Sequence, residues 1–124
     1  MVMEGTVHRP NVSDEYLTPE HCWILETWNH PSDPTLSLAQ ARVQPGVTTQ
    51  LHSLTGVSER YLIHAGEGRM YLGTSTPQDV QPGDVVHIPA GVAQKITNTG
   101  QNDLVFTCIC TPPFTPDCYV NLEA

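Results

Sequence analysis

The sequence has 124 residues and a mass of 13.6 kDa, a length that supports one hydrophobic core and is too short for two domains. Eleven prolines and nine glycines interrupt it too often for long helices, which favours an all-β fold. The formal net charge of −8 opposes binding to phosphate backbones and anionic lipid surfaces, so neither nucleic acid nor a membrane is an expected partner.

The N-terminus and the cysteines indicate the compartment. The stretch from Met1 to Pro10 has neither a basic leader nor an apolar signal core. None of the four cysteines forms the Cys-x-x-Cys pair of a zinc site, so all are expected to be free thiols in a reducing compartment. These features predict a soluble, cytoplasmic protein.

The first 35 residues are expected to form an arm and an edge strand. Residues 1–20 show no hydrophobic period, whereas residues 22–28 alternate in the manner of a strand. The segment 29–34 has the composition of a turn, and a second strand is expected over residues 36–43.

Short strands and regular turns fill the region 36–112. Further strands are expected over residues 48–54, 59–65, 69–73, 84–88, 94–98 and 104–110, with connectors rich in glycine and proline. No amphipathic helix of useful length interrupts them, which indicates an antiparallel sandwich or barrel. The proline-rich tail 113–124 cannot continue a central strand and is expected to pack on the barrel through Phe114 and Tyr119. The three parts are expected to form one domain.

Two blocks of residues with regular spacing lie within this region. The first block contains Gly46, His52, Glu59 and Gly66, and the second contains Gly83, Pro89-Ala90-Gly91, Gln94 and Asn98. Together they resemble the paired motifs of the cupin superfamily over roughly residues 38–111. The resemblance implies a small double-stranded β-helix, or jelly-roll barrel, in which the metal-binding motif is degenerate.

Strand alternation predicts which of these side chains meet. Gln50, His52 and Leu54 share one face of their strand, whereas Glu59, Tyr61 and Ile63 share a face of the next. If both faces point into one barrel, His52 and Glu59 converge, and Gln94 approaches from a third strand. By the same parity, His64 and His87 are expected to point outward.

The resemblance implies a divalent metal site, and this sequence departs from it. Cupin motifs offer two histidines, a glutamate and a third histidine, but here Leu54 and Gln94 stand at two of the histidine positions. The remaining candidate ligands are His52, Glu59 and Gln94, one nitrogen and two oxygens. Such a set should bind Mn, Fe, Zn or Ni more weakly than three histidines, with a preference for Mn²⁺ or Fe²⁺ over copper. Gln50 is an additional candidate ligand, or else it only bonds a neighbouring strand or loop.

Glu59 and Tyr61 are the candidate catalytic residues. Burial would raise the pKa of Glu59 into the range of a general base. Tyr61 could donate a hydrogen bond to a substrate oxygen, or be an ordinary core aromatic residue. Cys108 and Cys110 share one strand face, where they could act as thiolates or, as most buried cysteines do, as small hydrophobic residues.

Two functions are consistent with this pattern. The first is a divalent-metal-dependent enzyme, of the dioxygenase, isomerase or lyase type, acting on a small oxygen-rich molecule in the barrel. The alternative is a metal-free, non-catalytic cupin that binds or senses a small molecule. The resemblance also implies a homodimer, in which the strand carrying Trp23 and Trp28 could cover a partner.

Overall fold

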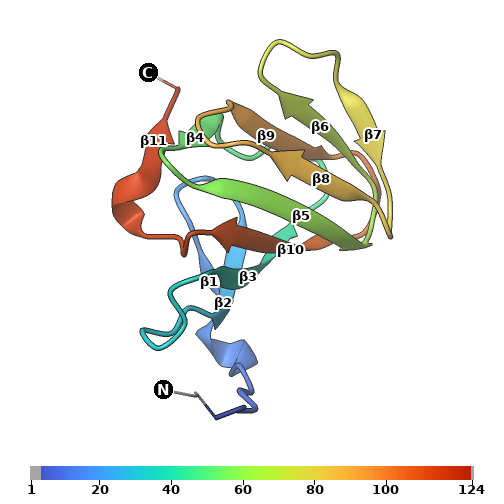
Figure 1. Ribbon diagram of the computed structural model, residues 1–124. Helices are drawn as coiled ribbons and strands as arrows, with labels where there is room; N and C mark the ends of the chain where they lie inside the picture. Colours follow the sequence, from blue (N-terminus) through green and yellow to red (C-terminus); the bar gives the residue numbers. More distant parts are fainter. Residues whose placement is uncertain (1–3, 124) are drawn as a thin grey trace.

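Two antiparallel β-sheets lie face to face in the computed structural model, which describes residues 4–123 (Figure 1). The larger sheet has the strand order β1 (Tyr16–Leu17), β2 (Trp23–Trp28), β3 (Ser37–Val43), β10 (Leu104–Thr111), β5 (Ser58–Ala65), β8 (Val85–Ile88). The smaller sheet has the order β11 (Tyr119–Asn121), β4 (His52–Leu54), β9 (Gln94–Asn98), β6 (Gly68–Leu72), β7 (Gln78–Val80). Two short 3₁₀ helices, η1 (Val12–Asp14) and η2 (Pro116–Cys118), precede β1 and β11.

This architecture confirms the expected jelly-roll fold. It is a two-sheet sandwich rather than the closed barrel that the sequence suggested, because no ladder joins the edge strands β8 and β7 within residues 4–123. In the same range no helix is long and apolar enough to span a membrane. Residues 1–3 of the expected arm and residue 124 of the expected tail lie outside the described range.

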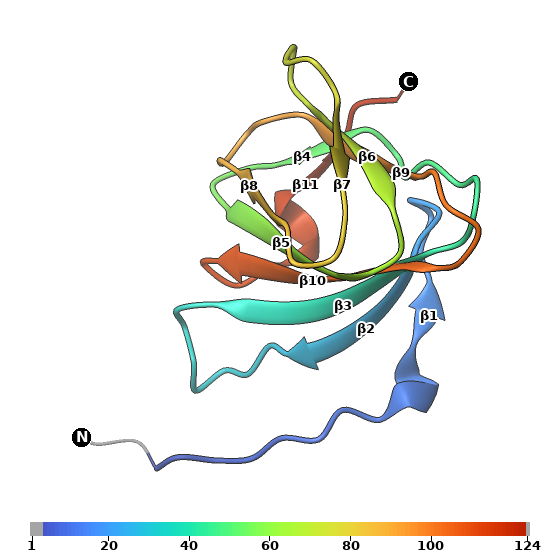
Figure 2. The same cartoon turned by 90° about the vertical axis from the view of Figure 1, so that its right-hand side faces the viewer.

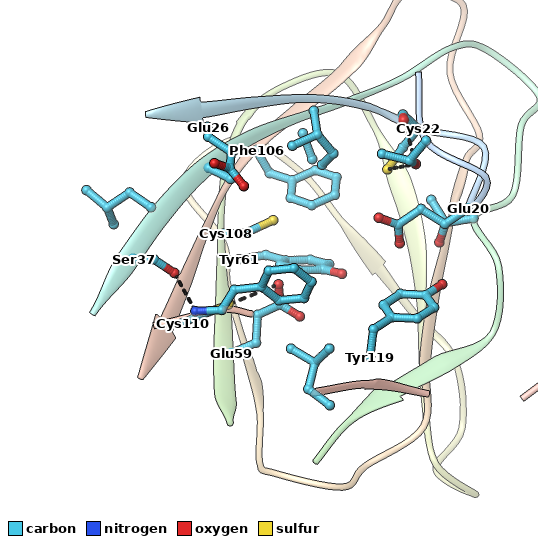
Figure 3. A pocket seen from close by; sticks show the side chains of 18 of the residues that line it. Glu20, Cys22, Glu26, Ser37, Glu59, Tyr61, Phe106, Cys108, Cys110 and Tyr119 are labelled. Atoms are coloured by element: carbon cyan, nitrogen blue, oxygen red, sulfur yellow. Dashed lines mark hydrogen bonds between the residues drawn. The ribbon is translucent and has the colours of Figure 1, made fainter. Parts of the chain in front are cut away.

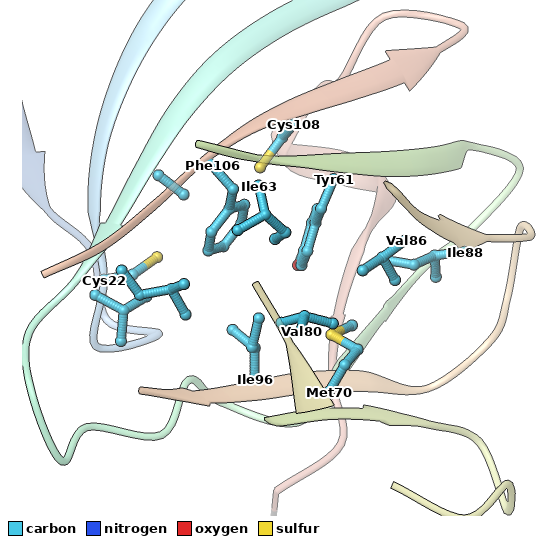
Figure 4. Packing of buried hydrophobic residues seen from close by; sticks show 13 residues of the cluster. Cys22, Tyr61, Ile63, Met70, Val80, Val86, Ile88, Ile96, Phe106 and Cys108 are labelled. Atoms are coloured by element: carbon cyan, nitrogen blue, oxygen red, sulfur yellow. The ribbon is translucent and has the colours of Figure 1, made fainter. Parts of the chain in front are cut away.

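Alternation along the central strands builds the core between the sheets. On β5 the side chains of Glu59, Tyr61 and Ile63 are buried, as their shared parity predicts, while His64 is exposed. On β10 every second residue is buried in the same way, and the rings of Tyr61 and Phe106 pack with centroids 4.2 Å apart. Figure 4 shows this apolar cluster, whose labelled members are Cys22, Tyr61, Ile63, Met70, Val80, Val86, Ile88, Ile96, Phe106 and Cys108.

The strand expected over residues 48–54 is shorter in the structure. Only His52–Leu54 forms β4, because Thr48 makes an isolated bridge to Thr97 and the backbone N–H of Gln50 donates to the carbonyl of Glu20. The short strands β1, β7 and β11 have too few residues to show a period in the sequence.

Arg42 fastens the N-terminal segment to the larger sheet. Its guanidinium donates to both carboxylate oxygens of Glu15, at 2.6 and 3.0 Å, and to Asp103 at 3.1 Å. It also lies over the ring of Trp23, 5.1 Å from the centroid. Figure 2 shows the N-terminal segment running beside β2 before β1 joins the edge of the sheet. These contacts fix the entry to β2, and with it the residues between β1 and β2.

Gly66 holds the β5–β6 hairpin against the loop that precedes β10. Its φ is +86°, and a Cβ at this position would lie 2.6 Å from the carbonyl oxygen of Asp103. Glycine alone fits both the backbone conformation and the close approach.

Candidate functional site

A cavity of about 150 Å³ lies between the sheets, and both ends of the chain help to enclose it (Figure 3). Residues of β3, β5 and β10 line the cavity from the larger sheet. His52 and Leu54 of β4 line it from the smaller sheet. The segment that includes β1 and β2 contributes Tyr16, Thr18, Glu20, Cys22, Ile24 and Glu26, and the tail contributes Phe114 and Tyr119.

Three side chains form a hydrogen-bonded chain beside this cavity. The Tyr61 hydroxyl donates to Gln94 Oε1 at 2.5 Å, and Gln94 Nε2 donates to Glu59 Oε1 at 2.9 Å. Gln94 is completely buried, and Glu59 is 7% exposed. Both ends of the Gln94 amide are therefore engaged, and the chain fixes the orientation of the Glu59 carboxylate.

The surroundings of Glu59 raise the pKa of its carboxyl group. Burial raises the pKa of this carboxyl, and the Gln94 hydrogen bond and the nearby charge of His52 only partly offset the effect. Burial and the charge of Glu59 raise the pKa of Tyr61 well above its usual value, so the phenol keeps its proton. Glu59 thus has the environment expected of a general base. The Tyr61 hydroxyl uses its hydrogen in the bond to Gln94.

His52 is held in a defined tautomer at the edge of the cavity. Its Nδ1 lies 2.7 Å from the backbone carbonyl of Gln50, which can only accept, so Nδ1 carries a hydrogen. The carboxylate of Glu20 is 3.8 Å from the same nitrogen, and the ring stacks on Tyr119 with centroids 4.7 Å apart. No hydrogen bond to Nε2 is present within residues 4–123, which leaves its lone pair for a ligand.

Gln50 is hydrogen-bonded to Tyr119 and Glu20. Its side-chain oxygen accepts a hydrogen bond from the Tyr119 hydroxyl at 2.6 Å, and its backbone N–H donates to the Glu20 carbonyl at 3.0 Å. These bonds connect Gln50 to β11 and to the segment before β2.

The cysteines around the cavity are neutral thiols. Cys22, Cys108 and Cys110 line it, and the Cys110 thiol donates to Glu59 Oε2 at 3.7 Å. Burial, together with nearby carboxylates, raises the pKa of all three thiols. They therefore form an apolar wall and match the interpretation of Cys108 and Cys110 as small hydrophobic residues.

Sequence reasoning missed Glu20 and Glu26 as residues of this site. Glu26 on β2 is the cross-strand partner of Ala39 on β3, and both side chains line the cavity. Strand alternation could therefore have predicted that Glu26 belongs to the site. Glu20 lies in an irregular segment whose position depends on backbone contacts with Gln50, and the sequence contains no local signal for that contact.

Residues 39–110 match the sequence profile of the Cupin domain family. The chain belongs to the cupin family. Over 79 residues this cupin is 37% identical to the uncharacterized protein MJ1618 of Methanocaldococcus jannaschii. The match covers 64% of this chain and 62% of that protein, so the chain spans less than two thirds of its relative.

Solved cupin structures superpose on most of the chain. Oxalate decarboxylase from Bacillus subtilis has a TM-score of 0.75 at 24% identity, covering 90% of this cupin and 30% of the enzyme. The nucleoside dehydratase Pac13, from Streptomyces, has a TM-score of 0.76 at 16% identity, covering 94% of this cupin and 92% of that chain. At these identities the likeness establishes the fold.

Oxalate decarboxylase contains Mn(II) centres, and a cupin domain therefore raises the question of a metal. Within residues 4–123, no three or more histidine, cysteine, aspartate or glutamate side chains are grouped so that they could hold one. Leu54 has no donor atom, and the carbonyl oxygen of Gln94 accepts from Tyr61. The donor set as arranged, His52 and Glu59, does not fit a resident metal centre.

Proposed function

We propose that this cupin binds a small oxygen-bearing molecule between its sheets and acts on it as an isomerase or lyase, with Glu59 transferring the proton. One observation carries the proposal: a carboxylate that is 7% exposed faces the cavity and is held in place by Gln94. Burial makes such a carboxylate a stronger base and moves its pKa toward the working pH of an enzyme.

A proton transfer of this kind balances without a further reactant. Glu59 removes a proton from the carbon next to a carbonyl group, and the C–H electron pair forms an enolate. Return of that proton to the enolate oxygen gives the enol isomer. In an α-hydroxy carbonyl compound, its return to the former carbonyl carbon, with transfer of the hydroxyl hydrogen to the other oxygen, gives the isomer in which the two groups have exchanged places. In a lyase, the electron pair of the same C–H bond forms a double bond as a group leaves the next carbon with its own electron pair.

The other polar residues have supporting roles in this proposal. Tyr61 acts as a positioning residue, because its hydroxyl orients Gln94, which in turn orients Glu59. Direct donation from Tyr61 to a substrate oxygen would require it to release Gln94. His52 can accept a hydrogen bond from a substrate hydroxyl through Nε2, since Nδ1 is occupied by the Gln50 carbonyl.

The test is turnover by the Glu59→Gln variant, after small keto, hydroxy and sugar compounds have been screened for a substrate. The substitution preserves the shape and removes the base, so turnover should fall by about 10²-fold or more. The control is Glu67→Gln, which makes the same change of charge at an exposed residue outside the cavity and should keep full turnover. Wild-type turnover in Glu59→Gln would refute the proposal.

A metal-dependent form of the enzyme is a second candidate only in a different side-chain arrangement, although His52 and Glu59 line the same cavity in a cupin fold. A third ligand would require the Gln94 oxygen to leave Tyr61. On this hypothesis Gln94→His should raise the content of Mn, Fe, Zn or Ni after purification without chelators, and His52→Ala should lower it. Equal metal content in the wild type and both variants would eliminate this form.

A non-catalytic binding or sensing protein is the alternative, and the replacement of two motif histidines by Leu54 and Gln94 favours it. On this alternative, Glu59→Gln changes ligand affinity, and no substrate is turned over by the wild type. We further propose that this cupin is a homodimer in the cytoplasm, a location that its four free cysteines support.

A further inference from the structure

Three carboxylates face the cavity without a matching cation. Glu20, Glu26 and Glu59 point toward it in Figure 3. No lysine or arginine is present among the described residues that line it, and His52 is its one basic side chain. The Glu20 carboxylate already lies 3.8 Å from His52 Nδ1. An anionic ligand would therefore meet excess negative charge, which solvent screens least at the buried Glu59 and most at the exposed Glu26.

Glu59 supplies a buried oxygen for such a ligand. Gln94 donates to Oε1, and the Cys110 thiol, a weak donor, approaches Oε2 at 3.7 Å. A carboxylate that is 7% exposed ordinarily has a charged or strongly polar partner. Oε2 is thus the oxygen that can accept the proton in the proposed function, and the positive charge of a ligand would be met by the Glu20 and Glu26 carboxylates on the other side of the cavity.

Aromatic rings form much of the remaining wall, from Tyr16, Tyr61, Phe106, Phe114 and Tyr119. Rings of this kind attract cations through their faces and pack against an apolar body. The volume of about 150 Å³ matches that of a protein cavity that holds one benzene molecule. The cavity is therefore suited to a ligand with a compact apolar body.

We infer that this cavity takes a small organic cation, an amine with an apolar body about the size of benzene, and rejects carboxylates. The inference rests on the proposed function, since it takes this cavity as the substrate site, and it narrows the substrate to a hydroxylated or carbonyl-bearing amine. On this inference the substrate of this cupin differs in charge from oxalate, the substrate of an enzyme such as oxalate decarboxylase. The oxalate dianion would be repelled by the three carboxylates of the cavity.

A charge series of three molecules with one ring tests the inference by equilibrium binding. Benzylamine, benzyl alcohol and benzoate share a skeleton and differ in charge at about pH 7.5. At low ionic strength, titration calorimetry or NMR shifts should rank benzylamine first and benzoate last, with an affinity difference of about tenfold or more. Glu20→Gln should lower the affinity for benzylamine by about threefold or more and leave the affinity for benzyl alcohol unchanged.

Glu26→Gln is the second variant, because the Glu26 side chain is exposed and its replacement should not affect folding. This variant should also lower the affinity for benzylamine. Glu67→Gln, outside the cavity, should change none of the three affinities. If benzoate binds as tightly as benzylamine, the inference about charge fails while the proposed site stands. If none of the three probes binds, the inference about a ligand with a benzene-sized body fails, whereas the proposed function is still decided by the turnover of Glu59→Gln.

Discussion

Glu59 occupies a position where an amide of the same shape would be more stable. Its folded pKa is raised above its ordinary value, chiefly by burial, so folding favours the protonated form. Below the unfolded pKa both states are protonated and no penalty exists; as the pH rises through the folded pKa, the wild type progressively loses stability. A carboxylate kept at such a site is better explained by activity than by stability.

Glu59→Gln should therefore stabilise the fold in a pH-dependent manner. The variant should match the wild type near pH 4 and exceed its free energy of unfolding by about 1 to 3 kcal/mol at neutral pH, the usual penalty for a poorly compensated buried group. Urea unfolding from about pH 4 to about pH 8 measures the difference. Glu67→Gln, at an exposed site, should show a flat difference, and the same flat result for Glu59→Gln would contradict this account.

Tyr61→Phe should have a different signature at the same site. Removal of the hydroxyl leaves the buried Gln94 oxygen without a donor, which should lower the free energy of unfolding by about 1 to 3 kcal/mol. On the proposed function, kcat should fall with little change in KM, because Tyr61 orients the base rather than binding substrate. A rise in KM with unchanged kcat would instead assign Tyr61 to substrate binding.

At the scale of the elements, the regular strands could be predicted from the sequence. The contacts that residues of other strands and loops make at the cavity could not. Strand alternation and the two spaced blocks predict that Glu59 and Tyr61 point inward, and the structure confirms this burial. The role of Gln94 was harder to predict, because an amide offers both a donor and an acceptor and its use depends on neighbours from other strands. Glu20 could not be predicted, since a backbone contact 30 residues away along the chain positions it.

The N-terminal arm should loosen when Arg42 is replaced. Arg42→Gln removes the bidentate pair with Glu15 and the contact with Asp103, so hydrogen exchange at residues 16–22 should accelerate. These pairs are partly exposed, and the free energy of unfolding should fall by only about 1 kcal/mol.

Arg69→Gln is the matched control, because it breaks the Arg69–Asp79 pair on exposed side chains of the other sheet. It should leave both exchange at residues 16–22 and the free energy of unfolding unchanged. If Arg42→Gln also leaves hydrogen exchange and the free energy of unfolding unchanged, strand pairing alone holds the arm. The Arg42 ion pairs would then not be needed to place Glu20 at the cavity.

At the scale of the whole molecule, the open sandwich leaves edge strands on both sheets, and such edges are commonly covered by a second copy. The tryptophans expected to cover a partner are engaged within the chain, since Trp28 Nε1 donates to Asp33 and Trp23 lies beneath Arg42. The edge strand β8 instead presents Val85, which is 65% exposed and pairs with Leu62 of β5.

We predict a homodimer through this edge, with an association that strengthens as salt is added. Each chain carries a net charge of −8, so two copies repel one another until salt screens the repulsion. Val85→Asp adds charge at the edge and should shift the equilibrium to monomer, whereas Val12→Asp, at a 79% exposed position in the arm, should not. Sedimentation equilibrium over a range of salt and protein concentrations measures both effects. A mass of 13.6 kDa that does not change with either concentration would refute the dimer, and a dimer that Val85→Asp leaves intact would move the interface away from β8.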